Sequence, residues 1–141
     1  MPNFVLDNSI AMRWLLASNK KADQNYSEQV LLSLKENQAY VPNLWHLEAA
    51  NVLLTAEKRD ELTTGEIETF LLQLEALPII TDPSTHSQVF NHTIHIAQCY
   101  KLSSYDAAYL ELAIREGLPI ATLDKNLKKA AQKASVEIYL K

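Results

Sequence analysis

The feature that most constrains the fold is the short apolar run Phe4-Val5-Leu6, which stops at the acid Asp7. The run is too short for a helix, and a pattern with helical spacing begins directly after it. A strand that is apolar on both faces is typical of a parallel sheet covered by helices on both sides. In such sheets, ligands bind beyond the carboxyl ends of the strands. Asp7 follows the carboxyl end of this strand and is therefore a candidate site residue.

The rest of the chain alternates between predicted helices and short predicted strands. After the first strand, further strands are predicted at residues 39–41, 78–80, 118–122 and 136–140. One or two predicted helices lie between successive strands, and the helix before the last strand is short. This alternation predicts an α/β fold, a three-layer α/β/α sandwich with a central, mainly parallel, five-stranded sheet. Because we find no repeat and no linker, we expect a single domain over residues 1–141.

Composition limits the partners and the compartment. The formal net charge of −4 argues against a broad basic surface that would hold nucleic acid by neutralising phosphates. No apolar run approaches the roughly 20 residues that a membrane helix needs, so we expect no membrane association. Cys99 is the single cysteine, which excludes an internal disulfide. Together with the lack of a signal-peptide pattern, this indicates a cytoplasmic protein.

One predicted helix, from residue 44 to about residue 59, is the most apolar in the chain. On a helical wheel its polar side chains Glu48, Asn51 and Thr55 fall together in one narrow stripe. The pattern predicts a helix that is buried around most of its circumference, with the polar stripe lining a crevice. A stripe that simply faces solvent is the alternative.

Two further acids stand in positions that need an explanation. Asp106 falls within the apolar arc of its predicted helix, but it could also close a capping box with Ser103. Asp124 follows the strand at 118–122 much as Asp7 follows the first strand, but it could be an ordinary N-cap. If these two strands are neighbours, both carboxylates lie at the same edge of the sheet.

Several carboxylates that converge stay ionised together only when cations compensate their charge. Mg²⁺ or Mn²⁺ suits such a set, because these ions prefer oxygen ligands and Mg²⁺ keeps several waters. An ion of this kind can offset the charge that develops on a phosphodiester. Metal-dependent phosphoester cleavage is therefore the reaction class that fits the acids.

Four motifs, in this order, resemble those of PIN domains, and in particular those of VapC-like toxins of type II toxin–antitoxin modules. They are Val5-Leu6-Asp7-Asn8-Ser9, Val41-Pro42-Asn43-Leu44-x-x-x-Glu48-x-x-Asn51, Tyr105-Asp106-Ala107-x-Tyr109-x-x-x-Ala113 and Ala121-Thr122-x-Asp124-x-x-Leu127. Each motif is weak alone, whereas four in the right order over essentially the whole chain are fairly specific.

The resemblance implies a Mg²⁺- or Mn²⁺-dependent endoribonuclease that leaves 5′-phosphate and 3′-hydroxyl ends. The family's catalytic and metal-binding acids correspond to Asp7, Glu48, Asp106 and Asp124, with Ser9 and Thr122 orienting carboxylates. The resemblance also implies an RNA substrate, a homodimer, a cognate antitoxin protein and a higher toxin–antitoxin assembly. A PIN-like module that has lost catalysis and only binds proteins is the alternative.

Basic residues near the acids are candidates for contact with the RNA backbone. Lys125, Lys128, Lys129 and Lys133 cluster on the predicted helix after Asp124. A solvated helix face is the alternative interpretation. Arg13, Lys20 and Lys21 are further candidates. We therefore predict RNA contacts for Arg13, Lys125, Lys128 and Lys129.

Overall fold

A computed structural model describes residues 3–141 and contains one sheet. Its strands are β1 (Phe4–Leu6), β2 (Ala39–Val41), β3 (Ile79–Thr81) and β4 (Ile120–Ala121). They lie in the order β3-β2-β1-β4, and every neighbouring pair is parallel. The predicted α/β class with a parallel sheet is confirmed, but the described residues form four strands and not five.

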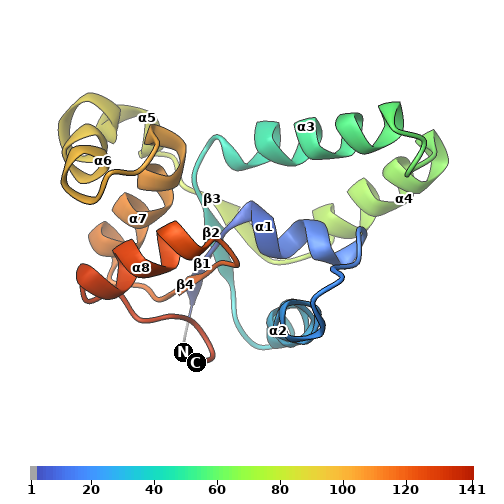
Figure 1. Ribbon diagram of the computed structural model, residues 1–141, viewed down its shortest axis with the longest axis horizontal. Helices are drawn as coiled ribbons and strands as arrows, with labels where there is room; N and C mark the ends of the chain where they lie inside the picture. Colours follow the sequence, from blue (N-terminus) through green and yellow to red (C-terminus); the bar gives the residue numbers. More distant parts are fainter. Residues whose placement is uncertain (1–2) are drawn as a thin grey trace.

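Helices cover both faces of the sheet. Figure 1 shows α1 to α4 on one side of the sheet and α5 to α8 on the other. The helical segments are α1 (Asn8–Ala11), η1 (Met12–Trp14), α2 (Lys21–Ser33), α3 (Trp45–Lys58), α4 (Thr64–Glu75), α5 (Thr85–Gln88), η2 (Val89–Thr93), α6 (Ile94–Tyr100), α7 (Ser104–Glu116) and α8 (Lys125–Lys133). Within residues 3–141, none of these helices has the length and apolar character that crossing a membrane requires.

The first strand lies inside the sheet and is fully buried. β1 pairs with β2 on one side and with β4 on the other. Phe4, Val5 and Leu6 each have 0% exposed surface, as expected for a strand covered on both faces. Because β1 and β4 are parallel neighbours, their carboxyl ends lie at the same edge of the sheet. Asp7 and Asp124 follow these two ends.

The segment predicted as a fifth strand, residues 136–140, is not a strand. Only Ile138 forms an isolated parallel bridge, to Ile120 in β4. Ser135 and Leu140 adopt left-handed backbone angles, each with φ of 60°, and these angles interrupt extended backbone at both ends of the segment. The segment nevertheless contributes Tyr139 to the core, where it is 3% exposed.

Helix α3 is less buried than its sequence predicts. Trp45, Ala49 and Leu53 face the core, but Leu47 is 78% exposed and Leu54 is 54% exposed. Figure 1 shows why: α3 and α4 pair as a hairpin that extends away from the sheet. A helix that packs mainly against one partner buries only one face, whatever its composition.

The region between Asp82 and Tyr100, where the apolar pattern indicates one helix, consists of three helical segments. The short helix α5 is followed by η2, a π-helical segment, before α6 begins at Ile94. A π-helical segment shifts the register of the side chains that follow it, so a helical wheel drawn through the whole region misplaces the face of α6. None of the residues of α6 is buried.

Tyr139 should hold the closing segment to the core. Its hydroxyl accepts a hydrogen bond from Asn37 Nδ2 at 2.7 Å and donates one to Ser33 Oγ at 2.8 Å, and its ring stacks on Phe4. Tyr139→Phe removes both hydrogen bonds, so we expect the free energy of unfolding to fall by about 1–3 kcal/mol in urea denaturation. Tyr105→Phe, at a ring that is 62% exposed, is the control and should change it by less than about 0.5 kcal/mol. Equal effects of the two variants would contradict this role.

Candidate active site

The centre of the site is the carboxylate of Asp7, which lies at the end of β1 and is only 6% exposed. Its Oδ2 atom accepts hydrogen bonds from Ser9 Oγ at 2.7 Å and from Thr122 Oγ1 at 2.6 Å. Within residues 3–141, no hydrogen bond reaches its Oδ1 atom. One oxygen of Asp7 is thus fixed by the protein, and the other is available to a ligand.

The two hydroxyl groups that hold Asp7 also connect the ends of β1 and β4. Ser9 Oγ accepts a hydrogen bond from the backbone N–H of Leu123 at 3.0 Å, and Thr122 Oγ1 accepts one from that of Asp124 at 3.0 Å. Each hydroxyl therefore accepts from the backbone after β4 while it donates to Asp7. This arrangement fixes the orientation of the Asp7 carboxylate and the path of the chain that leads to Asp124.

Asp124 and Asp106 both lie at the starts of helices, but they use their carboxylates differently. Asp124 caps α8, because its Oδ1 accepts from the N–H of Leu127 at 2.8 Å. The start of α7 is capped by Ser103, whose Oγ accepts from the N–H of Asp106 at 3.1 Å. The reciprocal bond of a capping box is missing, and among the described residues the Asp106 carboxylate makes no hydrogen bond. Helix capping accounts for Asp124 in part and leaves the Asp106 carboxylate unexplained.

Glu48, near the start of α3, is held by a residue that the sequence motifs did not assign to the site. Tyr109, with 0% exposed surface, donates a hydrogen bond from its hydroxyl to Glu48 Oε1 at 2.5 Å. Its spacing in the sequence could have identified it as a site residue. Tyr109 lies three residues after Asp106 and therefore on the same side of α7. Tyr109 connects α7 to α3 at the site.

The electrostatics show that these carboxylates lie near one another. Burial raises the pKa of Asp7 to about 6, and repulsion by Glu48 and Asp124 adds to this effect against the hydroxyl hydrogen bonds. Burial also raises the pKa of Asp106 to about 6, with further contributions from Asp124 and Asp7. The pKa of Glu48 is raised by burial and by Asp106, while the Tyr109 hydrogen bond opposes the rise. Mutual repulsion of this kind favours binding of a cation.

The residues suit a hydrated divalent cation better than a metal enclosed by protein ligands. Within residues 3–141, no three His, Cys, Asp or Glu side chains are close enough to form a ready-made metal site. The donors are carboxylate oxygens, however, and Mg²⁺ commonly binds one or two carboxylates and keeps its remaining waters. Next to Asp7 in the chain, Asn8 Oδ1 is buried without a partner in the described structure, and such an atom usually pairs with water or an ion.

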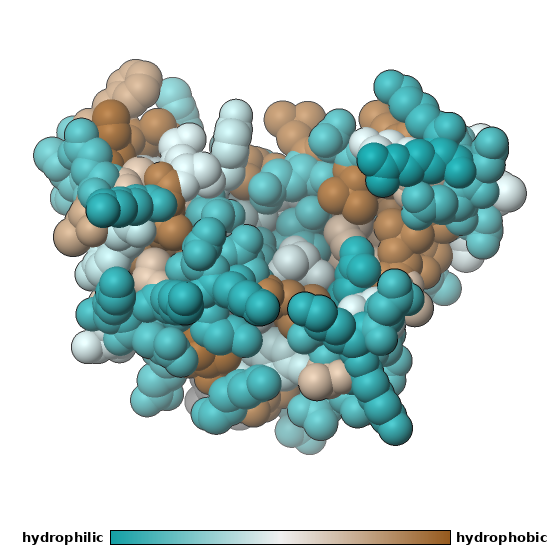
Figure 2. Space-filling model, viewed as in Figure 1, coloured by the Kyte–Doolittle hydropathy of each residue, from teal (hydrophilic) through white to brown (hydrophobic). Residues whose placement is uncertain are grey.

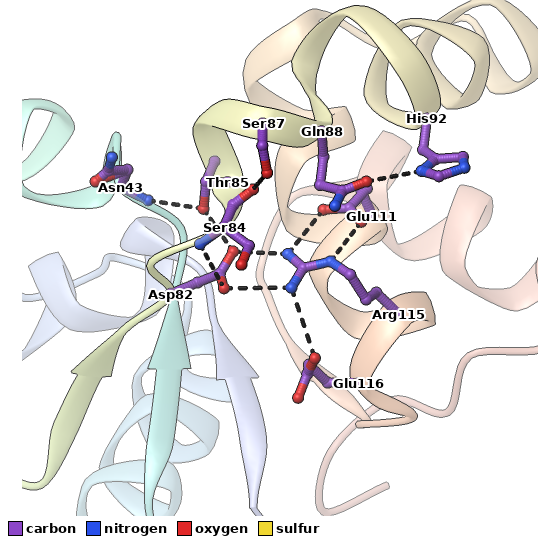
Figure 3. Close-up of polar contacts among 10 residues, drawn as sticks. All are labelled: Asn43, Asp82, Ser84, Thr85, Ser87, Gln88, His92, Glu111, Arg115 and Glu116. Atoms are coloured by element: carbon purple, nitrogen blue, oxygen red, sulfur yellow. Dashed lines mark hydrogen bonds and ion pairs between the residues drawn. The ribbon is translucent and has the colours of Figure 1, made fainter.

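Asp82 is a third acid that follows a strand end, but it does not belong to this set of carboxylates. Asp82 follows β3, but Arg115 on α7 binds it through Nη2 to Oδ2 at 2.6 Å (Figure 3). Although burial alone would raise it, hydrogen bonds from Arg115, Thr85 and the Ser84 backbone lower the pKa of Asp82. Asp82 is therefore a compensated anion that holds α7 to the end of β3.

Arg115 also binds Glu111, with Nε to Oε2 at 2.8 Å. On a helical wheel Glu111 lies on the side of α7 opposite the apolar arc, where an acid is expected to face solvent. The structure instead buries Glu111 to 3% exposure, because Arg115 neutralises it inside the protein. Figure 3 shows Arg115 between Asp82 and Glu111, so the two ion pairs share one guanidinium group.

The predicted RNA-contacting residues are spread over two regions. Lys125, Lys128 and Lys129 lie on α8 directly after Asp124, with Lys125 and Lys129 exposed and Lys128 half-buried. Arg13 lies in η1, beyond α1, and is also half-buried. Only the three lysines share an element that starts at the candidate site.

A parallel sheet between helices, with carboxylates gathered at the ends of its central strands, defines a class of candidate metal-dependent hydrolases. Comparison with known proteins narrows this class. The PIN domain profile matches residues 4–133, and the chain therefore belongs to the PIN domain family. No match was found among curated proteins.

Solved structures show the same fold at low sequence identity. PAE2754 from Pyrobaculum aerophilum has a TM-score of 0.65 and 19% identity, with 92% of this chain and 79% of that chain covered. VapBC2 from Rickettsia felis, bound to a DNA fragment from its promoter, has a TM-score of 0.61 and 15% identity, covering 90% and 92%. A toxin–antitoxin complex from Klebsiella pneumoniae has a TM-score of 0.58 and 20% identity, covering 86% of each.

The raised pKa of Asp7 predicts how stability depends on pH when no metal is bound. Because the folded protein holds this proton up to about pH 6 and the unfolded chain only to about 3.8, the folded state is favoured as the pH falls from about 7 to about 4. Asp7→Asn removes the buried charge, so we expect it to stabilise the protein by up to about 3 kcal/mol at about pH 7.5 in EDTA. Urea denaturation measures this difference.

The same comparison at about pH 4 is the internal control, because there Asp7 is protonated in the wild-type fold and the gain should nearly vanish. An Asp7→Asn variant that is less stable than the wild type at both pH values would contradict the buried, repelled carboxylate.

Tyr109 should position Glu48 for metal binding. Tyr109→Phe keeps the ring in the core but removes the hydrogen bond that lowers the pKa of Glu48. We expect about a 10- to 100-fold weaker affinity for Mn²⁺, as for other residues that hold a metal ligand in place. Titration calorimetry measures the affinity, and Tyr105→Phe on the same helix is the matched control. An unchanged Mn²⁺ affinity would remove Tyr109 from the site.

Proposed function

We propose that the chain is a metal-dependent endoribonuclease that hydrolyses RNA phosphodiester bonds, and that it is the toxin of a type II toxin–antitoxin module in the cytoplasm. The observation that carries the proposal is the Asp7 carboxylate, which is buried and is repelled by Glu48 and Asp124, and one oxygen of which has no hydrogen-bond partner among residues 3–141. A buried acid under such repulsion is destabilising in the absence of a cation, which supports a role in binding one.

In this proposal, Asp7 and Asp106 bind Mg²⁺ or Mn²⁺ directly. Their carboxylates differ from that of Asp124, because neither caps a helix. Glu48 and Asp124 act through water ligands, a second ion or the attacking water. When bound, such an ion supplies positive charge that offsets the charge developing on the phosphodiester. Ser9 and Thr122 keep the Asp7 carboxylate in one orientation, so that its Oδ1 stays directed at the ligand.

The toxin assignment is supported by membership of the PIN domain family and by solved structures of similar fold, among them the toxin–antitoxin complex from Klebsiella pneumoniae and VapBC2 from Rickettsia felis. We further propose a cognate antitoxin, a homodimer and a higher toxin–antitoxin assembly for this chain.

The surface offers room for such partners over α3 and α4. Figure 2 shows hydrophobic side chains gathered there, beside a hollow in the upper edge of this face. A groove of about 490 Å³ between the two helices is lined by residues that include Leu53, Leu54 and Leu71. An apolar groove of this kind is a candidate interface for such a partner.

Contacts with the RNA backbone are proposed for Arg13, Lys125, Lys128 and Lys129. Lys125 directly follows Asp124, so a strand whose scissile phosphate lies at the carboxylates would pass close to it. The modest negative net charge of −4 is concentrated in part in the site itself, which a bound cation would offset.

The nuclease proposal is tested with Asp106→Asn and Asp7→Asn. We expect wild-type protein to cleave a mixed single-stranded RNA pool with Mg²⁺ or Mn²⁺, and each variant to lose at least about 100-fold in rate, since carboxylate ligands are removed. EDTA should abolish wild-type cleavage. Gel separation and end analysis of the products, expected to carry 5′-phosphates, provide the measurement.

Glu68→Gln on α4, which removes an exposed acid, is the matched control and should cleave as the wild type does. Full activity of Asp7→Asn and Asp106→Asn would show that the acids are not catalytic. A purified, folded wild-type chain that binds Mn²⁺ but cleaves no RNA would instead favour the protein-binding PIN-like module.

A further inference from the structure

A small basic pocket lies along α8, the helix that begins directly after Asp124, and does not include the carboxylates. It has a volume of about 220 Å³ and is lined by Tyr100, Lys101, Asn126, Lys129, Ala130 and Lys133. Lys101 follows the end of α6, whereas the other two lysines lie on α8, nearly thirty residues later in the chain. The fold therefore adds Lys101 to a lysine cluster that the sequence shows only in part.

The chemistry of the lining selects for an anion. Its polar side chains are three ammonium groups, an amide and a phenol, all of which can donate hydrogen bonds, and no acid lines the pocket. Across residues 3–141, the ion pairs involve only Arg115 with acids, so Lys101, Lys129 and Lys133 have no anionic partner in the described structure. All three lysines are exposed and accessible to a ligand.

The position of the pocket connects it to the acids. Asn126, Lys129 and Lys133 form one stripe along α8, and this stripe begins two residues after Asp124. From Asn126 to Lys133 the stripe extends about 10 Å along the helix axis, so a polyanionic strand can contact it at more than one phosphate. Lys101 stands just before α7, the helix that carries Asp106.

We propose that this pocket is a phosphate-binding subsite that holds the backbone of the RNA strand on the α8 side of the carboxylates. The proposal rests on the proposed ribonuclease function for the identity of the strand. It assigns Lys101, Lys129 and Lys133 as positioning residues that bind the strand away from the scissile bond. It also predicts different roles for two lysines of α8, because Lys129 lines the pocket and Lys128 does not.

The test is the binding of a short single-stranded RNA in EDTA, where no cleavage can occur. We expect Lys101→Glu/Lys133→Glu to weaken binding at least about tenfold at low salt, and to reduce the steepness of the salt dependence by about 0.7 for each phosphate that the pocket no longer neutralises. Lys35→Glu/Arg59→Glu makes the same change in net charge at exposed positions outside the pocket and is the matched control. Thermal melts of both variants show whether the fold is retained.

Arginine variants separate charge from a structural role. Lys101→Arg/Lys133→Arg should bind RNA as the wild type does, and Lys129→Glu should lose more affinity than Lys128→Glu. A pocket pair that binds RNA no more weakly than the control pair overturns the proposal. So does an arginine pair that fails to bind RNA although it folds.

Two further titrations distinguish other anions from RNA. Saturable binding of inorganic phosphate that depends on the pocket lysines, with RNA binding unaffected by their removal, would assign the pocket to a free anion and overturn the proposal. The same result with a poly-glutamate peptide would assign the pocket to an acidic protein segment and would also overturn the proposal.

The subsite and the nuclease function can fail separately. Wild-type protein that binds RNA through the pocket but cleaves none with Mn²⁺ would contradict the nuclease function alone. Unchanged cleavage and unchanged RNA affinity after removal of the pocket lysines would contradict the subsite alone.

Discussion

The carboxylate of Asp7 is buried at the end of a fully buried strand, and much of the candidate site is arranged around that one costly charge. Two hydroxyl groups, from Ser9 and Thr122, hold one of its oxygens, and each also accepts a hydrogen bond from the backbone that follows β4. The same contacts therefore orient the acid and join the two central strand ends. Because these hydrogen bonds do not fully offset burial, the pKa of Asp7 remains high at about 6. Buried carboxylates that repel one another lower the free energy of unfolding, and a bound cation would offset this effect.

The sheet edge shows that a strand-end acid is not by itself a site. Asp7 and Asp82 both follow parallel strands, yet Asp82 is neutralised by Arg115 and its pKa is lowered. The difference lies in the partner: a guanidinium for Asp82, and other carboxylates for Asp7. Arg115 pairs in addition with Glu111, so the acids of α7 divide into a structural group at its end and Asp106 at its start. The uncompensated carboxylates are therefore Asp7 and Asp106, which repel one another.

Much of the fold was predictable from local patterns. The strands at Phe4–Leu6 and Ala39–Val41 and the starts of α4 and α7 follow from apolar runs and capping residues. Capping at Thr63 and Ser103 needs only neighbouring residues, so local sequence contains the necessary information. The predicted fifth strand failed because strand formation needs a partner along its whole length, and Ser135 and Leu140 turn the chain away. The burial of α3 was overestimated because composition does not reveal that α3 and α4 extend from the body as a hairpin.

The sequence by itself determined the α/β class, the order of the four acids and their placement at strand ends and helix starts, because these depend on periodicity and neighbours in the chain. Only the tertiary structure decided that β1 and β4 are adjacent, that Tyr109 donates to Glu48 and that Lys101 joins the lysines of α8. It also decided that Arg115 neutralises Asp82. These outcomes share one physical reason: each depends on the distance between side chains that are far apart in the sequence, and that distance is set by how the whole core packs.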